Sequence, residues 1–201
     1  LVPMAREADV ILLVGNRTNQ NGTDSWQLYP PGARYIQLDI DGNEVGDLGK
    51  VPPARRVGGP GASVLMAPFV HCSTARPGRF SDGSYGIYYA GDREEVALAE
   101  TIHHHAKFMT ATEEAPGWTS DFRALIGSID RDLHDVNAVP GVLHPADYAP
   151  SQALGAALRA AGSDGLVWNS VRMPGGQCIG AFWPDVVGIP VQGAHFCYHW
   201  N

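Results

Sequence analysis

The sequence predicts an α+β fold, in which helices flank a mixed or antiparallel sheet and a small α/β unit comes first. Short apolar runs recur along the chain and end at glycine or proline. The 201 residues include 24 Gly and 15 Pro, which is more typical of many turns and short elements than of a helical bundle. Two helical patterns stand among these runs, and the second half is rich in expected strands.

The first unit is expected over residues 1–47. Residues 10–14 form a continuous apolar run, as in a strand buried on both faces. Residues 16–25 are a polar loop, 29–32 a turn and 34–40 a second strand. Glycine, proline and charge accumulate over residues 46–56, and this change in composition predicts a boundary, with the main domain over residues 48–201.

The main domain combines several short strands with two helices. Asp92 and Glu95 have the spacing of a capping box, which opens a helix through about Met109. An Ala/Leu-rich helix over residues 151–161 is ended by Gly162. The expected strands cover residues 64–70, 85–90, 123–129, 133–136, 165–168, 178–182 and 186–189.

Charge and composition exclude several functional classes. Fourteen Lys+Arg against 21 Asp+Glu give a net charge of −7, so a nucleic-acid partner is not expected. The longest strongly apolar run, Val10 to Val14, is far shorter than the ~20 residues of a membrane-spanning helix. Three scattered cysteines do not form a disulfide framework, and the N-terminal residues lack a signal-peptide pattern, so we expect a cytoplasmic protein.

The helix expected over residues 92–109 contains the most informative polar residues. Ala97, Glu100, His104 and Phe108 share one stripe, so a carboxylate stands on a partly apolar face. Glu100 is therefore either paired with a cation, used in chemistry, or placed on an exposed flank of the helix. Residues 103–105 are three adjacent histidines, which point about 100° apart and do not converge on a metal. They either form a helix face near the mouth of a pocket or are solvated, and we expect the latter.

Two glycine-containing turns carry further candidate side chains. Arg79 lies in the segment 78–86, and its planar guanidinium suits a carboxylate or phosphate, although a turn that merely contains an arginine is the simpler interpretation. Ser170 and Arg172 follow the strand expected at 165–168, in a segment that is either a site or a plain loop. The chain has no GxSxG, P-loop or GxGxxG motif.

Arg79, Glu100 and Ser170, in this order and in these contexts, resemble the signature of the RES domain family. The resemblance covers about residues 51–200. It is carried by motifs around residues 56–71, 79–90, 97–100, 132–135, 151–155, 169–172 and 175–178. Several long motifs in the same order are more specific than any one of them.

The resemblance implies a fold similar to that of ADP-ribosyltransferase toxins and an enzyme that destroys NAD+. Its substrate would be NAD+, cleaved between nicotinamide and ribose by hydrolysis or phosphorolysis. Glu100 would stabilise the positive charge that develops on the ribose. Arg79 and Arg172 would hold the diphosphate, Tyr89 would pack on the nicotinamide or ribose, and Ser170 would orient the ribose or the attacking group.

The resemblance leaves alternatives open. A protein acceptor in place of water or phosphate would make the domain a mono-ADP-ribosyltransferase, and a catalytically impaired domain would only bind its antitoxin. The family implies a bacterial toxin–antitoxin pair with a cognate antitoxin of the Xre or DUF2384 type. No metal is expected, and neither nucleic acid nor a membrane is an expected partner.

The first 47 residues lack the arginine-bearing segment with which RES domains usually begin. Residues 8–19 and 35–46 instead resemble a piece of the central domain of thiamine-diphosphate enzymes of the acetolactate synthase type. The motif of such enzymes that binds the cofactor is absent, so no thiamine diphosphate is expected. Arg55 and Arg56 are candidate replacements for the missing arginine.

Overall fold

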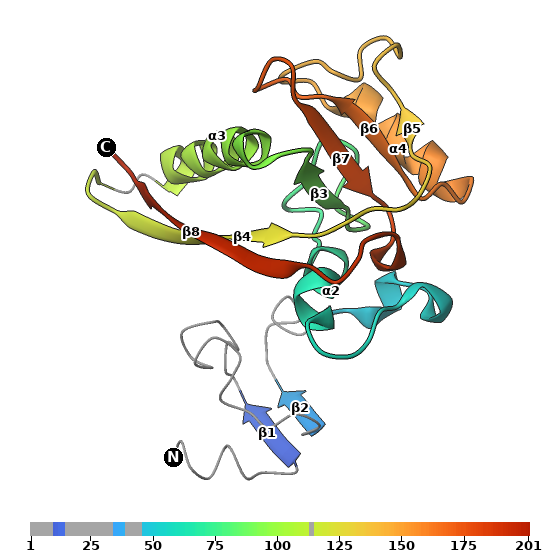
Figure 1. The fold of residues 1–201 in the computed structure, drawn as a ribbon, viewed down its shortest axis with the longest axis vertical. Coiled ribbons are helices and arrows are strands. Elements are labelled where there is room, and N and C mark those ends of the chain that lie inside the picture. The colour runs from blue at the N-terminus through green and yellow to red at the C-terminus, as the bar shows by residue number, and fades with distance from the viewer. Residues whose placement is uncertain (1–9, 15–33, 39–45, 113–114) are drawn as a thin grey trace. The chain divides into compact units, whose positions relative to one another are not determined.

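A computed structural model describes residues 10–14, 34–38, 46–112 and 115–201 of the chain. The chain divides into two compact units, Leu1–Asp47 and Leu48–Asn201, each described by itself. Figure 1 labels the helices and strands of both units.

The first unit contains a two-stranded parallel sheet. Strands β1 (Val10–Val14) and β2 (Arg34–Leu38) pair in parallel along their whole length. Parallel neighbours need a crossover connection, as in an α/β unit. The expected strand at residues 10–14 is confirmed, and the second is confirmed over 34–38. The loop expected at 16–25 and the turn at 29–32 lie outside the described residues.

The main unit contains a four-stranded sheet in the order β3-β7-β6-β5. Its strands are β3 (Tyr88–Gly91), β5 (His134–Asp135), β6 (Gly165–Asn169) and β7 (Gln177–Ala181). The β3/β7 and β6/β7 pairs are antiparallel, whereas β5 and β6 are parallel. Together with the helices beside it, this mixed sheet confirms the predicted α+β class.

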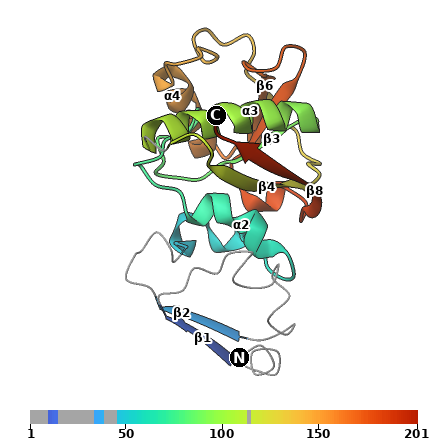
Figure 2. The ribbon, with the colours of Figure 1, turned by 90° about the vertical axis from the view of Figure 1, so that its left-hand side faces the viewer.

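A second, two-stranded antiparallel sheet lies beneath α3 in Figures 1 and 2. It pairs β4 (Thr119–Ile126) with β8 (Val191–His199). Helix α3 spans Glu94–Thr112, so the helix expected from Asp92 is confirmed with its start moved by two residues. The helix packs on this two-stranded sheet through aromatic side chains. The centre of the His105 ring on α3 lies 5.1 Å from that of Phe122 on β4 and 5.9 Å from that of Tyr198 on β8.

The strand predicted over residues 64–70 is wrong, because these residues form helix α2 (Ala62–Val70). The buried residues Leu65, Met66, Phe69 and Val70 recur with helical spacing. A short apolar run fits a buried helix and a buried strand equally well, and the prediction chose the wrong one of the two.

The remaining elements are helix α4 (Ala149–Ala160) and three short 3-10 turns, at Leu48–Lys50, Pro53–Arg55 and Pro184–Val186. The strand expected over residues 186–189 is wrong, since the chain turns there and the regular strand is β8, further on. None of the helices among the described residues is long and apolar enough to cross a membrane.

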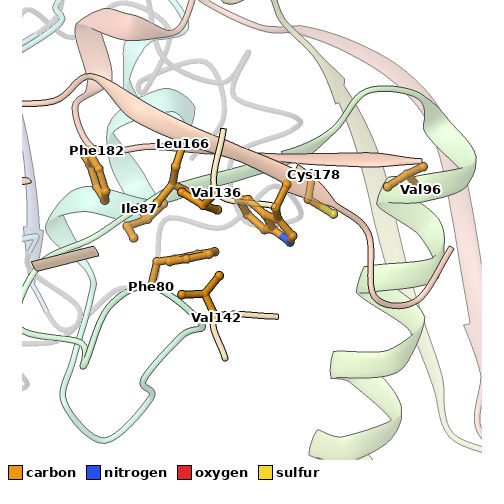
Figure 3. Packing of buried hydrophobic residues seen from close by; sticks show 9 residues of the cluster. Phe80, Ile87, Val96, Val136, Val142, Leu166, Cys178 and Phe182 are labelled. Carbon is orange, nitrogen blue, oxygen red and sulfur yellow. The ribbon is translucent and has the colours of Figure 1, made fainter. Parts of the chain in front are cut away.

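The main hydrophobic core lies beside the four-stranded sheet and reaches α3 (Figure 3). Phe80, Leu166 and Phe182 are fully buried in it. Phe80 and Trp168 pack with their ring centres 4.8 Å apart. Val96 brings α3 into the same cluster, as Figure 3 shows. This core holds the helix that carries Glu100 against the strand that precedes Ser170.

Candidate active site

Glu100 and Ser170 are joined by a directed hydrogen bond. The Ser170 hydroxyl, directly after β6, donates to Oε1 of Glu100 on α3 at 2.8 Å. Its oxygen also accepts the backbone N–H groups of Arg172 at 3.1 Å and Met173 at 3.0 Å. These two bonds use the acceptor positions of the hydroxyl, so its proton is directed to the carboxylate. Ser170 is arranged to orient Glu100.

Two glycines let the loop after Ser170 pack directly on α3. Gly175 has φ +77°, a left-handed conformation that favours glycine. A Cβ on Gly176 would lie within 2.2 Å of Cγ2 of Val96. The loop is closed by the Ser170 N–H, which donates to the Gly176 carbonyl at 2.8 Å. These contacts place the Ser170 hydroxyl beside Glu100.

Cys178 of β7 approaches the same carboxylate oxygen. Its Sγ lies 3.5 Å from Oε1 of Glu100. Burial, with the nearby Glu100 charge, raises the pKa of the Cys178 thiol to about 12. The thiol is therefore protonated at neutral pH and donates to the carboxylate. Sequence reasoning does not reveal this contact, because it depends on the pairing of β7 with β6.

Arg79 is positioned by the first turns of α4. The Ser151 hydroxyl donates to the Arg79 carbonyl at 2.6 Å, and the Gln152 amide donates to the Gly78 carbonyl at 2.9 Å. Gly155 allows the helix to approach Phe80, since a Cβ there would lie 2.1 Å from the Phe80 carbonyl oxygen. The motif over residues 151–155 thus fixes the backbone that carries Arg79.

Arg79 and Arg172 are anchored on neighbouring carbonyls of one loop. Nη1 of Arg79 donates to the His144 carbonyl at 2.8 Å, and its guanidinium lies 4.6 Å from the centre of the Tyr148 ring. Nη2 of Arg172 donates to the Pro145 carbonyl at 3.0 Å. The loop therefore brings two guanidiniums near each other, and these hydrogen bonds use only one nitrogen of each.

Tyr89 of β3 has a fixed hydroxyl and an accessible residue surface. The Tyr89 oxygen accepts the Phe80 N–H at 3.1 Å, and burial raises the pKa of this phenol above its usual value. The residue nevertheless remains 42% exposed. Its ring meets that of Trp168 edge to face at 6.2 Å, and Trp168 pairs with Cys178 across β6 and β7. Trp168 thus contacts Tyr89 on one strand and is paired with Cys178, which contacts Glu100, on another.

A pocket of about 310 Å³ is lined in part by Tyr89. It lies between the end of α2 and the segment before β3. Its other lining residues include Ala67, His71, Arg76 and Tyr85, together with several glycines. Glu100 and Ser170 do not line it.

The expectation that residues 103–105 are solvated is confirmed for His104, which is exposed, whereas His103 and His105 are half-buried. Burial lowers the pKa of His103 and His104, and the positive charge of Arg172 lowers it further, whereas the Glu100 carboxylate raises it. The pKa values of these two histidines therefore depend on the charges of the candidate site. His105 instead packs on the β4–β8 ribbon. In the part of the chain that the structure describes, no His, Cys, Asp or Glu cluster could hold a metal.

Arg55 and Arg56 do not replace a site arginine, so that hypothesis is wrong. Arg55 is paired with Asp164 at 2.5 Å and with Asp185 at 3.0 Å. Arg56 donates to the carbonyls of Val51 and Leu48, both at 2.8 Å. Arg55 thus attaches the first turns of the main unit to its body, and Arg56 holds these turns together.

The fold and these side chains define an α+β domain with an Arg–Glu–Ser constellation beside its four-stranded sheet. The family model described as "RES domain" matches residues 53–201, and the chain belongs to this family. The chain is also similar to the "Uncharacterized protein y4oC" of Sinorhizobium fredii (strain NBRC 101917 / NGR234), with 29% identity over 125 residues. The aligned part covers 61% of this chain and 51% of that relative, so the chain spans about half of its length.

Proposed function

We propose that this domain cleaves the bond between nicotinamide and ribose in NAD+, with water or inorganic phosphate as the acceptor. The observation that carries the proposal is the carboxylate of Glu100, oriented by the Ser170 hydroxyl at 2.8 Å, together with two arginines held on one loop, whose charges act on the same His103 imidazole as the Glu100 charge. A fixed carboxylate beside fixed cations suits a substrate that becomes positively charged at its ribose and is negatively charged at its diphosphate.

The proposed reaction transfers the electron pair of the glycosidic bond to the nicotinamide nitrogen. Nicotinamide leaves as a neutral molecule, and the positive charge passes to the ribose as an oxocarbenium-like state. The Glu100 carboxylate stabilises that charge. A water oxygen then gives ADP-ribose and a proton, whereas a phosphate oxygen gives ADP-ribose phosphate. Ser170 acts by orienting Glu100, because its hydroxyl proton is already directed to the carboxylate.

The arginines and the pocket suit the rest of the dinucleotide. Arg79 and Arg172 would bind the diphosphate with the nitrogens that the loop carbonyls leave available. Tyr89 would pack on the substrate between Glu100 and the pocket, and the adenosine end would enter the pocket.

The pocket assignment is tested by comparing two substrates. Ala67 lines the pocket from α2, and Ala67→Phe would fill part of it. We expect KM for NAD+ to rise about fivefold or more, while cleavage of nicotinamide mononucleotide, which lacks adenosine, changes less than about twofold. Equal effects on the two substrates would contradict the assignment.

The biological setting follows from the family resemblance. We propose that the protein is the cytoplasmic toxin of a toxin–antitoxin pair and that a cognate antitoxin of the Xre or DUF2384 type neutralises it by covering the site. NAD+ is a substrate in this proposal. The proposal includes neither a resident metal nor thiamine diphosphate, and neither nucleic acid nor a membrane as a partner.

The acceptor is tested with the purified chain, NAD+, and buffers with and without inorganic phosphate. Products are identified by mass spectrometry. ADP-ribose in both buffers indicates hydrolysis, and ADP-ribose phosphate in the phosphate buffer indicates phosphorolysis. Intact NAD+ in both buffers, with a folded sample, would contradict the proposed function.

A further inference from the structure

The Glu100 carboxylate receives two side-chain donors on the same oxygen. The Ser170 hydroxyl lies 2.8 Å from Oε1, and the Cys178 thiol lies 3.5 Å from it. The two donors come from neighbouring strands, since Ser170 follows β6 and Cys178 belongs to β7. Oε1 is thus held from the sheet side, which leaves Oε2 as the oxygen available to a substrate.

The Cys178 thiol is protonated and can therefore donate a hydrogen bond. The residue is only 4% exposed, and its thiol pKa of about 12 keeps the proton on sulfur at neutral pH. A thiolate at this place would repel the carboxylate. The raised pKa also makes the thiol a poor nucleophile, which separates it from reactive cysteines, whose thiol pKa is lowered.

The same residue is part of the hydrophobic core. Figure 3 shows Cys178 at the end of the core cluster that is nearest to α3. A residue of similar size without a donor would fill this space as well, but it would leave Oε1 with the Ser170 hydroxyl alone. The thiol is therefore the one group of this core cluster that both packs and hydrogen bonds to the candidate catalytic carboxylate.

We propose that Cys178 is a positioning residue, which together with Ser170 fixes the Glu100 carboxylate so that Oε2 faces the ribose. This inference rests on the proposed function, because the carboxylate is held for the cleavage step. It predicts an effect on turnover rather than on substrate binding, since the thiol touches Glu100 and does not touch the arginines that would bind the diphosphate.

The kinetic test compares three variants of the full chain with the wild type. Cys178→Ala removes the donor, Cys178→Ser restores a hydroxyl donor, and Cys197→Ala removes an exposed cysteine of β8 as the matched control. We expect Cys178→Ala to lower kcat about fivefold with KM changed less than about twofold. Cys178→Ser should keep kcat within about twofold of the wild type, like the control.

Two kinetic outcomes would overturn the proposal. One is a wild-type kcat in folded Cys178→Ala, and the other is a Cys178→Ser variant as slow as Cys178→Ala, which would indicate a packing role. Thermal melts establish that each variant is folded. A wild-type protein that releases no nicotinamide would instead contradict the proposed function.

A second test does not depend on activity. Iodoacetamide labelling at pH 9, followed for each cysteine by mass spectrometry, reports how readily the Cys178 thiolate forms. Glu100→Gln removes the negative charge that opposes this thiolate, so the Cys178 rate should rise about threefold or more relative to the Cys197 rate. An unchanged ratio would show that the thiol does not interact with the carboxylate and would overturn the proposal.

Discussion

The close approach of α4 to the segment that carries Arg79 predicts that Gly155→Ala destabilises the main unit. The added Cβ would lie 2.1 Å from the Phe80 carbonyl oxygen and 3.0 Å from its carbon. Neither atom belongs to a flexible side chain, so α4 and the backbone of Phe80 must separate by about 1 Å to reach ordinary contact distance. Overpacking of this kind costs about 1–3 kcal/mol.

Two further contributions act in opposite directions. Alanine is a better helix former than glycine by about 1 kcal/mol, which favours the variant. Separation of the helix from Phe80 also stretches the hydrogen bonds that the side chains of Ser151 and Gln152 donate to backbone carbonyls of the Arg79 segment. Each of these hydrogen bonds contributes about 1 kcal/mol. We therefore expect a net loss of about 1–3 kcal/mol in the free energy of unfolding.

Urea unfolding followed by circular dichroism measures this loss. Gly58→Ala is the matched control, because a Cβ at Gly58 has no atom within 4 Å and its φ lies outside the left-handed region. The control should stay within about 0.5 kcal/mol of the wild type. A Gly155→Ala variant as stable as the wild type would refute the packing argument, and with it the account of how Arg79 is positioned.

Two more predictions concern the carboxylate and its surroundings. Ser170→Ala removes the 2.8 Å bond to Glu100 and leaves the backbone N–H groups of the following turn without their acceptor. It should lower kcat for nicotinamide release about tenfold and lower the free energy of unfolding by about 1–3 kcal/mol. A variant with the kcat and the stability of the wild type would contradict the hydrogen bonds described for Ser170. Because the Glu100 charge raises the pKa of His103 and the Arg172 charge lowers it, Glu100→Gln should lower that pKa and Arg172→Ala should raise it in an NMR titration. A pKa that moves in neither variant, or in the opposite directions, would show that these charges do not surround His103.

The sequence predicted most helices and strands of the main unit, and for the candidate site it indicated single residues but not their pairing. Glu100 stands on a helical stripe beside apolar residues, and a carboxylate there needs a partner. Its partner, Ser170, lies 70 residues away and is brought near by the loop after β6. Local pattern alone identifies neither the pairing nor the thiol of Cys178, since both depend on which strands become neighbours.

Tertiary packing decided the elements that the sequence analysis missed. Residues 64–70 form helix α2, but a short run with no polar residue contains nothing that separates a helical from a strand periodicity. Strand β8 has only a weak alternation of exposed and half-buried residues, and it forms by pairing with β4. Gly155 looked like an ordinary helix glycine, whereas its missing side chain admits the Phe80 carbonyl.

The role of Glu100 in NAD+ cleavage is decided by measuring nicotinamide release by Glu100→Gln. The matched control is Glu95→Gln, an exposed glutamate in the first turn of the same helix. We expect folded Glu100→Gln to lose about a hundredfold or more in kcat, while Glu95→Gln retains the wild-type rate within about twofold. Nicotinamide release by Glu100→Gln at the wild-type rate would show that this carboxylate does not stabilise the positive charge on the ribose.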